Sequence, residues 1–185
     1  MRDYRSVGDD LEAYRRYVAG IAAASDGTII LNRSYDHATV IIGQLFNKAN
    51  EEVDILTGEL YIPVFGSKEV IQSAIKFLRT HPSGVLKILA EKPIPPTHPL
   101  LTSLEKVGVT HRVDLRVLPE RLKQTNGFHF AVADGRYFRF ERFPSRQDLE
   151  AIVQFGEEKV GSRLRQLFAD LHKQSPNMTA VAEHT

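Results

Sequence analysis

His129 is the residue of this sequence best suited to chemistry, because it stands in an alternating apolar and polar segment with carboxylates near it in the chain. Asp134 follows five residues later, and Glu141 stands in the next alternating segment. A carboxylate can orient an imidazole so that the imidazole acts as a nucleophile or a base. A structural role is the competing interpretation, and we favour it. Asp134 and Gly135 form an Asp-Gly pair, which is favoured in tight hairpin turns, so Asp134 can be explained by the turn alone. His129 can likewise be explained as a strand residue that hydrogen-bonds a neighbour.

The segment from residue 112 to residue 146 carries a local excess of positive charge. It holds eight basic and four acidic residues, in a chain whose formal net charge is only +1. Seven of the eight basic residues are arginines, interleaved with aromatic residues. Such a mixture is used for phosphate contact and base stacking, and also at protein interfaces, whereas a charged strand edge needs no partner at all. All three interpretations stay open, and the candidate phosphate or nucleic-acid ligands are Arg112, Arg116, Arg136, Arg139 and Arg142.

The composition excludes several other kinds of site. The chain has no cysteine, which excludes disulfides, thiolate metal sites and a cysteine nucleophile. Its seven histidines contain no pair at i,i+2 or i,i+4, and its glycines form no phosphate-binding loop, so we expect no metal and no cofactor. No apolar run is long enough to span a membrane, and the first residues lack the apolar core of a signal peptide. We therefore expect a cytoplasmic protein.

The elements that must position these residues alternate between helix and strand over the first two thirds of the chain. Apolar residues at steps of three and four predict helices, and short apolar runs predict strands. The expected helices are 9–24, 34–49, 67–78 and 100–107, and the expected strands are 28–31, 53–58, 85–90 and 113–118. This order favours an α/β fold with a mixed, mostly parallel sheet and helices on both faces.

A β-hairpin follows the alternating part. Residues 128–133 and 136–143 alternate in polarity on either side of Asp134-Gly135, which is the strongest short-range signal for a hairpin. A short apolar run at 151–155 predicts one more strand, and the spacing from Val160 to Leu171 predicts a closing helix. In strand 128–133, residues 127, 129 and 131 share one face, and Phe128, Phe130 and Val132 share the other.

This order of elements resembles one half of a phospholipase D superfamily domain over roughly residues 31–175. That family carries a His-x-Lys-x(4)-Asp motif that ends in Asp-Gly. When the two Asp-Gly pairs are matched, Gly127 stands where the family has its nucleophilic histidine and His129 stands where it has its lysine. Only Asp134 keeps the family residue. The resemblance implies a site made of two such halves, in one chain or across a dimer axis.

The resemblance and the broken motif together predict a catalytically degenerate domain that acts as a binding or scaffolding module, as a homodimer. Whether any enzyme activity survives stays open, and we favour its absence. One alternative is an active phosphodiesterase or nuclease that uses His129, with Asp134 or Glu141 as its orienting carboxylate, in a remodelled dimeric site. A second is nucleic-acid binding, without chemistry, through the arginines of 112–146.

We expect three parts along the chain. Residues 1–27 form a helical extension, residues 28–175 form the phospholipase D-like domain, and residues 176–185 form a flexible tail. The sequence leaves open whether the N-terminal helix covers a sheet edge or pairs two copies of the domain.

Overall fold

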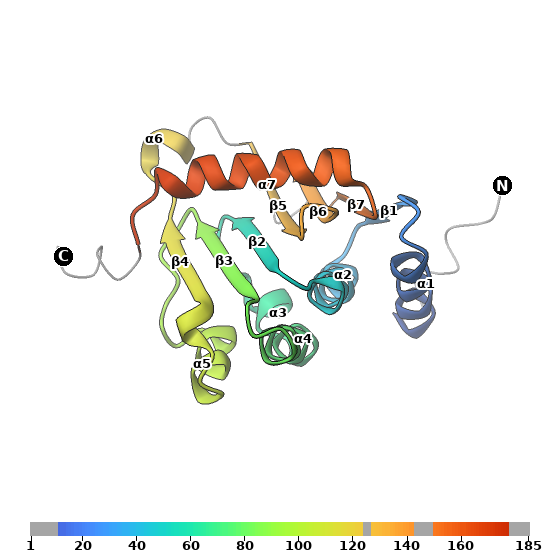
Figure 1. The fold of residues 1–185 in the computed structure, drawn as a ribbon, viewed down its shortest axis with the longest axis horizontal. Coiled ribbons are helices and arrows are strands. Elements are labelled where there is room, and N and C mark those ends of the chain that lie inside the picture. The colour runs from blue at the N-terminus through green and yellow to red at the C-terminus, as the bar shows by residue number, and fades with distance from the viewer. Residues whose placement is uncertain (1–10, 124–126, 143–149, 178–185) are drawn as a thin grey trace.

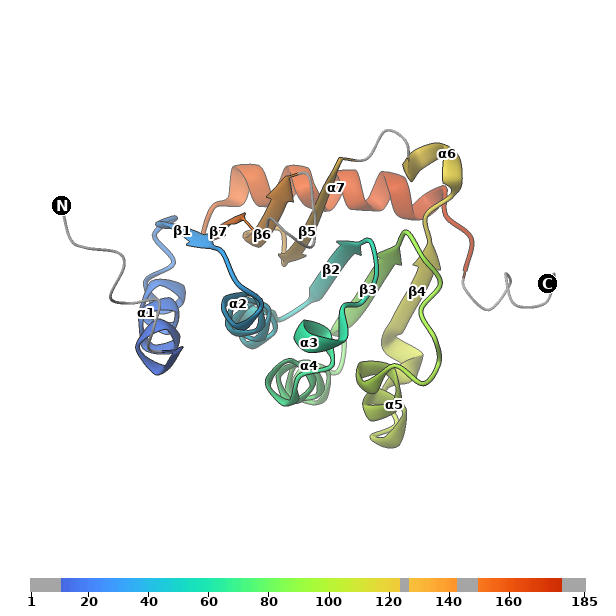
Figure 2. The same cartoon turned by 180° about the vertical axis from the view of Figure 1, so that it is seen from behind.

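The computed structural model describes residues 11–123, 127–142 and 150–177. A seven-stranded sheet of order β1-β7-β6-β5-β2-β3-β4 runs through its centre. Helices α1 to α5 lie on one side of this sheet, and the long helix α7 lies across the other (Figure 1; Figure 2). The predicted α/β class, with helices on both faces, is confirmed.

The strands and helices fall close to the predicted ranges. The strands are β1 (Ile29–Asn32), β2 (Glu52–Thr57), β3 (Val85–Ala90), β4 (Val113–Val117), β5 (Phe128–Ala133), β6 (Tyr137–Arg142) and β7 (Ala151–Phe155). The helices are α1 (Leu11–Ala24), α2 (Tyr35–Lys48), α3 (Ile62–Phe65), α4 (Lys68–Thr80), α5 (Pro99–Lys106), α6 (Glu120–Lys123) and α7 (Glu158–Lys173), with a 3-10 turn at Thr110–Arg112. The short helices α3 and α6 were not predicted.

The sheet is mixed, but the expectation that parallel pairing would dominate is wrong. Only β2 with β3 and β3 with β4 are parallel, and the other four pairings are antiparallel. Three of the four antiparallel pairings involve the hairpin strands β5 and β6, and strand β1 makes the fourth. It pairs with β7 at the far edge, where Ile30 lies opposite Val153, rather than with the strand that follows it in the chain.

The hairpin is confirmed in the described residues, and it lies inside the sheet rather than at its end. Asp134 and Gly135 have φ values of 52° and 65°, as a turn with two left-handed central residues requires. Strand β5 also pairs with β2, and β6 also pairs with β7. Phe143, the last residue of the predicted hairpin, lies outside the described residues.

Apolar packing on both faces fixes the position of the sheet. Strand β2 is buried along its whole length, including the acidic side chains of Glu52 and Asp54. The larger core lies between the sheet and the helices α2 and α4, whose first residues follow the serine caps Ser34 and Ser67. The smaller core, which includes Phe130, lies beneath α7. Within the described residues, no helix has the length and apolar character needed to cross a membrane.

Helix α1 packs on the domain rather than standing apart from it. It buries Tyr14, Val18 and Ala22, and the Tyr14 ring stacks on the ring of His37 in α2 with 3.7 Å between ring centroids. At its end, the Gly27 N–H donates to the carbonyl of Phe155 in β7. The helix therefore covers the α2 side of the sheet.

Candidate functional site

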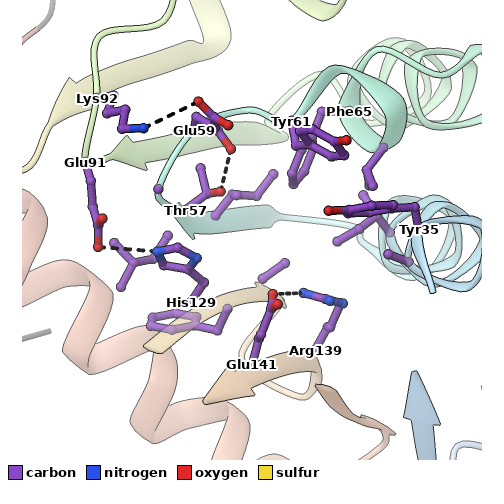
Figure 3. A pocket seen from close by; sticks show the side chains of 18 of the residues that line it. Tyr35, Thr57, Glu59, Tyr61, Phe65, Glu91, Lys92, His129, Arg139 and Glu141 are labelled. Atoms are coloured by element: carbon purple, nitrogen blue, oxygen red, sulfur yellow. Dashed lines mark hydrogen bonds and ion pairs between the residues drawn. The ribbon is translucent and has the colours of Figure 1, made fainter. Parts of the chain in front are cut away.

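A cavity of about 270 Å³ opens where the carboxyl ends of β2 and β3 meet the start of β5 and the end of β6. The N-terminus of α2 and the short helix α3 form its other wall (Figure 3). Ligands of open α/β sheets commonly bind outside the carboxyl ends of parallel strands. We call this cavity the site pocket, and its polar and aromatic lining residues are Ser34, Tyr35, Thr57, Glu59, Tyr61, Phe65, Glu91, Lys92, His129, Phe130, Arg139 and Glu141.

His129 lies in the site pocket and is held by a carboxylate that follows β3. Its Nε2 lies 3.3 Å from Oε1 of Glu91, and the two side chains are 18% and 25% exposed (Figure 3). Burial lowers the pKa of His129 below its ordinary value, although the negative charges of Glu91 and Glu141 oppose the shift. The imidazole is therefore neutral at pH 7 and oriented by Glu91.

Gly58 provides the space in which this pair meets. A Cβ atom at residue 58 would lie 3.0 Å from Cε1 of His129 and 3.6 Å from Oε2 of Glu91. The first distance is tighter than most real Cβ contacts and the second is an ordinary van der Waals distance, so a side chain here would require the imidazole to shift by a few tenths of an ångström. The glycine that ends the predicted strand 53–58 therefore gives the His129 ring room at its present position.

Arg139 and Glu141 form the second charged pair of the site pocket. Arg139 Nη1 donates to Glu141 Oε2 at 2.9 Å, and Arg139 Nε donates to Oδ1 of the fully buried Asn32 at 2.8 Å. Asn32 in turn donates to the carbonyl of Ser34, the cap of α2, at 2.9 Å. The guanidinium and the carboxylate are each only 11% exposed, so this ion pair is largely shielded from solvent.

The remaining wall is aromatic, with one exposed charged pair at the rim. The rings of Tyr35 and Tyr61 lie 4.6 Å apart at an angle of 39°, and Phe65 lies beside them in Figure 3. Lys92 Nζ and Glu59 Oε2 are 3.8 Å apart and are 69% and 40% exposed. Contacts of that kind contribute little to stability, so these two side chains can rearrange.

The expected face of strand β5 lines the cavity. His129 and Ala131 both line the site pocket, and Phe130 and Val132 pack into the core beneath α7, as the strand parity predicted, although part of Phe130 also borders the pocket. Gly127 is exposed at the start of β5 and brings no side chain. At the position where the phospholipase D superfamily has its nucleophilic histidine, this chain therefore has no side chain that could act as a nucleophile.

Asp134 lies at the opposite end of β5 from His129, and the structure does not bring the two together. Its Oδ1 accepts the backbone N–H groups of Glu51 and Glu52 at 3.0 and 2.9 Å, and its Oδ2 accepts that of Asn50 at 2.8 Å. Asp134 thus shapes the hairpin turn and the entry of β2. Of the two predicted orienting carboxylates, only Glu141 lines the site pocket, where its partner is Arg139.

Arg112, which ends the 3-10 turn, and Arg116 of β4 both bind the protein itself. Arg112 Nη1 donates to the carbonyl of His81 at 2.8 Å. Arg116 makes two bonds of 3.1 Å to the carboxylate of Asp114, and its Nη1 donates to the carbonyl of His172. Both guanidinium groups therefore fasten segments of the fold.

The hairpin separates the other three arginines. Arg136 lies at the turn, 3.6 Å from Glu158 and over the ring of Tyr137, whereas Arg142 is exposed at the opposite end of β6. Arg139 lies between them and faces the site pocket. The five predicted arginines thus form no single surface.

A second polar cluster lies on the other face of β2, under α7. Glu52 contacts Lys87 of β3, and Arg165 of α7 reaches it at 2.9 Å. Asp54 is 2% exposed, and burial together with the charge of Glu52 raises the pKa of Asp54 to about 8. At neutral pH Asp54 is protonated and hydrogen-bonded to Glu52. The Oδ1 of Asp54 has no hydrogen-bond partner among the described residues.

Sequence reasoning missed several residues of the site pocket. Glu91 and Glu59 are the most important, because they stand in loops after the strands β3 and β2. Tyr35 and Tyr61 were also missed. The available signal was topological, since the carboxyl ends of adjacent parallel strands meet at one edge of the sheet. No group of three or more metal-binding side chains was found in the part of the chain that the structure describes.

Comparison with known proteins identifies the fold. No family model matches the sequence, and no curated protein matches it significantly. Among solved structures, the chain is similar to Nuc, a phospholipase D family member of Salmonella typhimurium, with a TM-score of 0.57 and 9% identity over 82% of this chain and 98% of that one. The chain is also similar to NucT from Helicobacter pylori, with a TM-score of 0.58 and 9% identity over 82% of this chain and 99% of that one.

A third similar structure is TrmBL2, described as an archaeal chromatin protein with a novel mode of DNA binding. It gives a TM-score of 0.57 and 15% identity over 94% of this chain and 66% of that chain. Such low identities establish a shared architecture and not a shared activity. The order of elements, the central hairpin and these matches together show that the chain has a phospholipase D-like fold.

Proposed function

We propose that this chain is a phospholipase D-like domain that binds a small ligand in the site pocket and no longer hydrolyses phosphodiesters. One observation supports this best: Arg139, the only buried lysine or arginine of the site pocket among the described residues, is already bonded to Glu141 and Asn32. Phosphoryl transfer needs fixed positive charge on the non-bridging oxygens. Among the described residues that line this site, the remaining lysine or arginine is Lys92, which is exposed at the rim.

The position of His129, the candidate nucleophile, also argues against hydrolysis. His129 is neutral and oriented by Glu91, which is the state that a nucleophile needs. It stands, however, two residues from the family position occupied by Gly127, a displacement of about 6.6 Å along a strand. Reactive groups must approach within about 3–3.5 Å in good alignment, so a shift of that size is expected to abolish any inherited geometry.

A hydrolysis assay tests the loss of activity. We expect wild type and His129→Ala to turn over bis(p-nitrophenyl) phosphate, and to degrade single- and double-stranded DNA, at the same background rate. A wild-type rate clearly above that of His129→Ala would instead establish the alternative, an active phosphodiesterase that uses His129.

We also propose that two copies of the chain associate. The chain holds one phospholipase D-like half, and it matches Nuc over 98% of that protein's chain. The resemblance implies that sites of this family are built from two halves. Light scattering should give a dimer mass at micromolar concentration, and a strict monomer would refute the proposal.

Nucleic-acid binding is a weaker proposal, suggested by the similarity to the DNA-binding TrmBL2. The dispersal of the five arginines opposes it, because phosphate contacts add up only along one surface. We expect no change in the fluorescence anisotropy of a labelled duplex at about 50 mM salt, where phosphate contacts are strongest. Tight binding that weakens steeply with salt would restore this proposal.

A further inference from the structure

We propose that the ligand of the site pocket is a small organic cation, a protonated amine joined to an apolar or aromatic body. This inference rests on the proposed binding function and specifies its ligand class. It rests on three properties of the site pocket: its charge balance, its hydrogen-bond acceptors and its aromatic wall.

The charge balance of the site pocket is negative. Its lining residues in the described chain include three carboxylates and two cations. Arg139 and Glu141 neutralise each other across 2.9 Å, and Lys92 and Glu59 form a looser pair at the rim. Glu91 contacts only the imidazole of His129 among the charged or titratable side chains described. Its carboxylate is therefore the uncompensated charge.

The pair of Glu91 and His129 offers acceptors rather than donors. An ionised carboxylate can only accept, so the hydrogen bond between them places the imidazole proton on Nε2. Nδ1 of His129 then keeps its lone pair. The lowered pKa of His129 agrees with this neutral form. A ligand rich in N–H donors complements such a pair, whereas a phosphate or carboxylate would meet repulsion from Glu91.

The opposite wall suits the body of such a ligand. The rings of Tyr35 and Tyr61 lie across the cavity from Glu91, with Phe65 beside them (Figure 3). Aromatic faces attract cations and stack on flat apolar groups. The cavity volume of about 270 Å³ is close to that of about nine water molecules, and it lies just below the usual range for drug-sized ligands. An amine with a single ring fits this size.

The test uses three probes of similar size that differ in charge: the cation phenethylammonium, the neutral 2-phenylethanol and the anion phenylacetate. Each is titrated into the isotopically labelled full chain at pH 7, while amide signals are followed by NMR. We expect phenethylammonium to shift the amides of Thr57 and Ala131 saturably, with a Kd of about 1 mM, and phenylacetate to have no effect up to about 10 mM.

Variants then test the role of charge. Glu91→Gln keeps the size of the side chain and should weaken phenethylammonium binding about tenfold. Glu59→Gln, at the rim, should weaken it less. Glu105→Gln is the matched control, because this exposed residue lies in α5 outside the site pocket. Unchanged melting temperatures establish that each variant is folded.

The outcomes separate this inference from the function on which it rests. Equal affinity for the amine and the alcohol, or binding of phenylacetate at the same amides, would overturn the cationic class and leave the binding function standing. Unaltered amine affinity in Glu91→Gln, or no amine binding up to about 10 mM, would also overturn the inference. Failure of the proposed function is detected separately, by phosphodiester turnover that depends on His129.

Discussion

The buried carboxyl of Asp54 makes the stability of this fold depend on pH in a direction opposite to that of most aspartates. Its pKa is about 8 in the folded chain, against a reference value of 3.8. Between these values the unfolded chain ionises the group while the folded chain keeps the proton. The unfolded chain therefore binds fewer protons, and stability falls as pH rises from about 4 to about 8.

Asp54→Asn removes this cost, because the amide carries no charge and can still donate to Glu52. A shift of about four pKa units corresponds to at most about 6 kcal/mol, at about 1.4 kcal/mol per unit. Water entry and small movements of Lys87 and Arg165 reduce that ceiling, so we expect Asp54→Asn to stabilise the chain by about 2 kcal/mol at pH 8. For a protein of this size, that is a rise in melting temperature of about 4–8 °C.

Urea unfolding of wild type and Asp54→Asn at intervals from pH 4 to pH 9 measures the effect. The difference in unfolding free energy should be near zero at pH 4, grow to its full size by pH 8 and stay constant above it. Glu105→Gln, an exposed control, should show no such growth. A difference that is independent of pH, or a growing destabilisation by Asp54→Asn, would refute the reasoning.

Three further predictions concern the turn, the packing of α7 and the site pocket. Asp134→Gly keeps the positive φ but removes three hydrogen bonds to backbone N–H groups, so urea unfolding should show a loss of about 1–2 kcal/mol. Gly161→Ala would place a Cβ 2.3 Å from the carbonyl oxygen of Gly135, so the melting temperature should fall by several degrees as α7 is pushed away. The His129 imidazole should titrate below its ordinary pKa in NMR spectra, and still lower in Glu91→Gln, because Glu91 favours the charged form. A higher pKa in that variant would contradict the assigned geometry.

The sequence was sufficient to predict the hairpin and the facing of its residues, because those depend on local chemistry. Asp134-Gly135 determines the turn, and strict alternation determines that His129 and Ala131 share a side. The partner of His129 could not be predicted in the same way. Glu91 reaches it across 38 residues of chain, and that contact exists only because β2 pairs with both β3 and β5.

Long-range contacts also explain why the pairing of β1 and the arrangement of the arginines differ from what the sequence predicted. Chain order predicted parallel neighbours for β1, but its partner β7 lies over 100 residues away, and nothing local to Ile29–Asn32 encodes that pairing. The charge excess of 112–146 was real in the sequence. In the folded chain, however, Arg136 precedes β6 and Arg142 ends it. The arginines that are close in the sequence therefore do not form one positively charged surface.

The packing of α1 has a practical consequence for anyone who shortens or labels this chain. Tyr14 and Val18 are almost fully buried, and Gln154 of β7 donates to the carbonyl of Gly27 just after the helix. A fragment that starts at residue 28 would expose this apolar contact and leave the β1 edge without its anchor. Expression fragments should therefore retain everything from Leu11 onward, and a fused tag is better placed ahead of that helix than between it and β1.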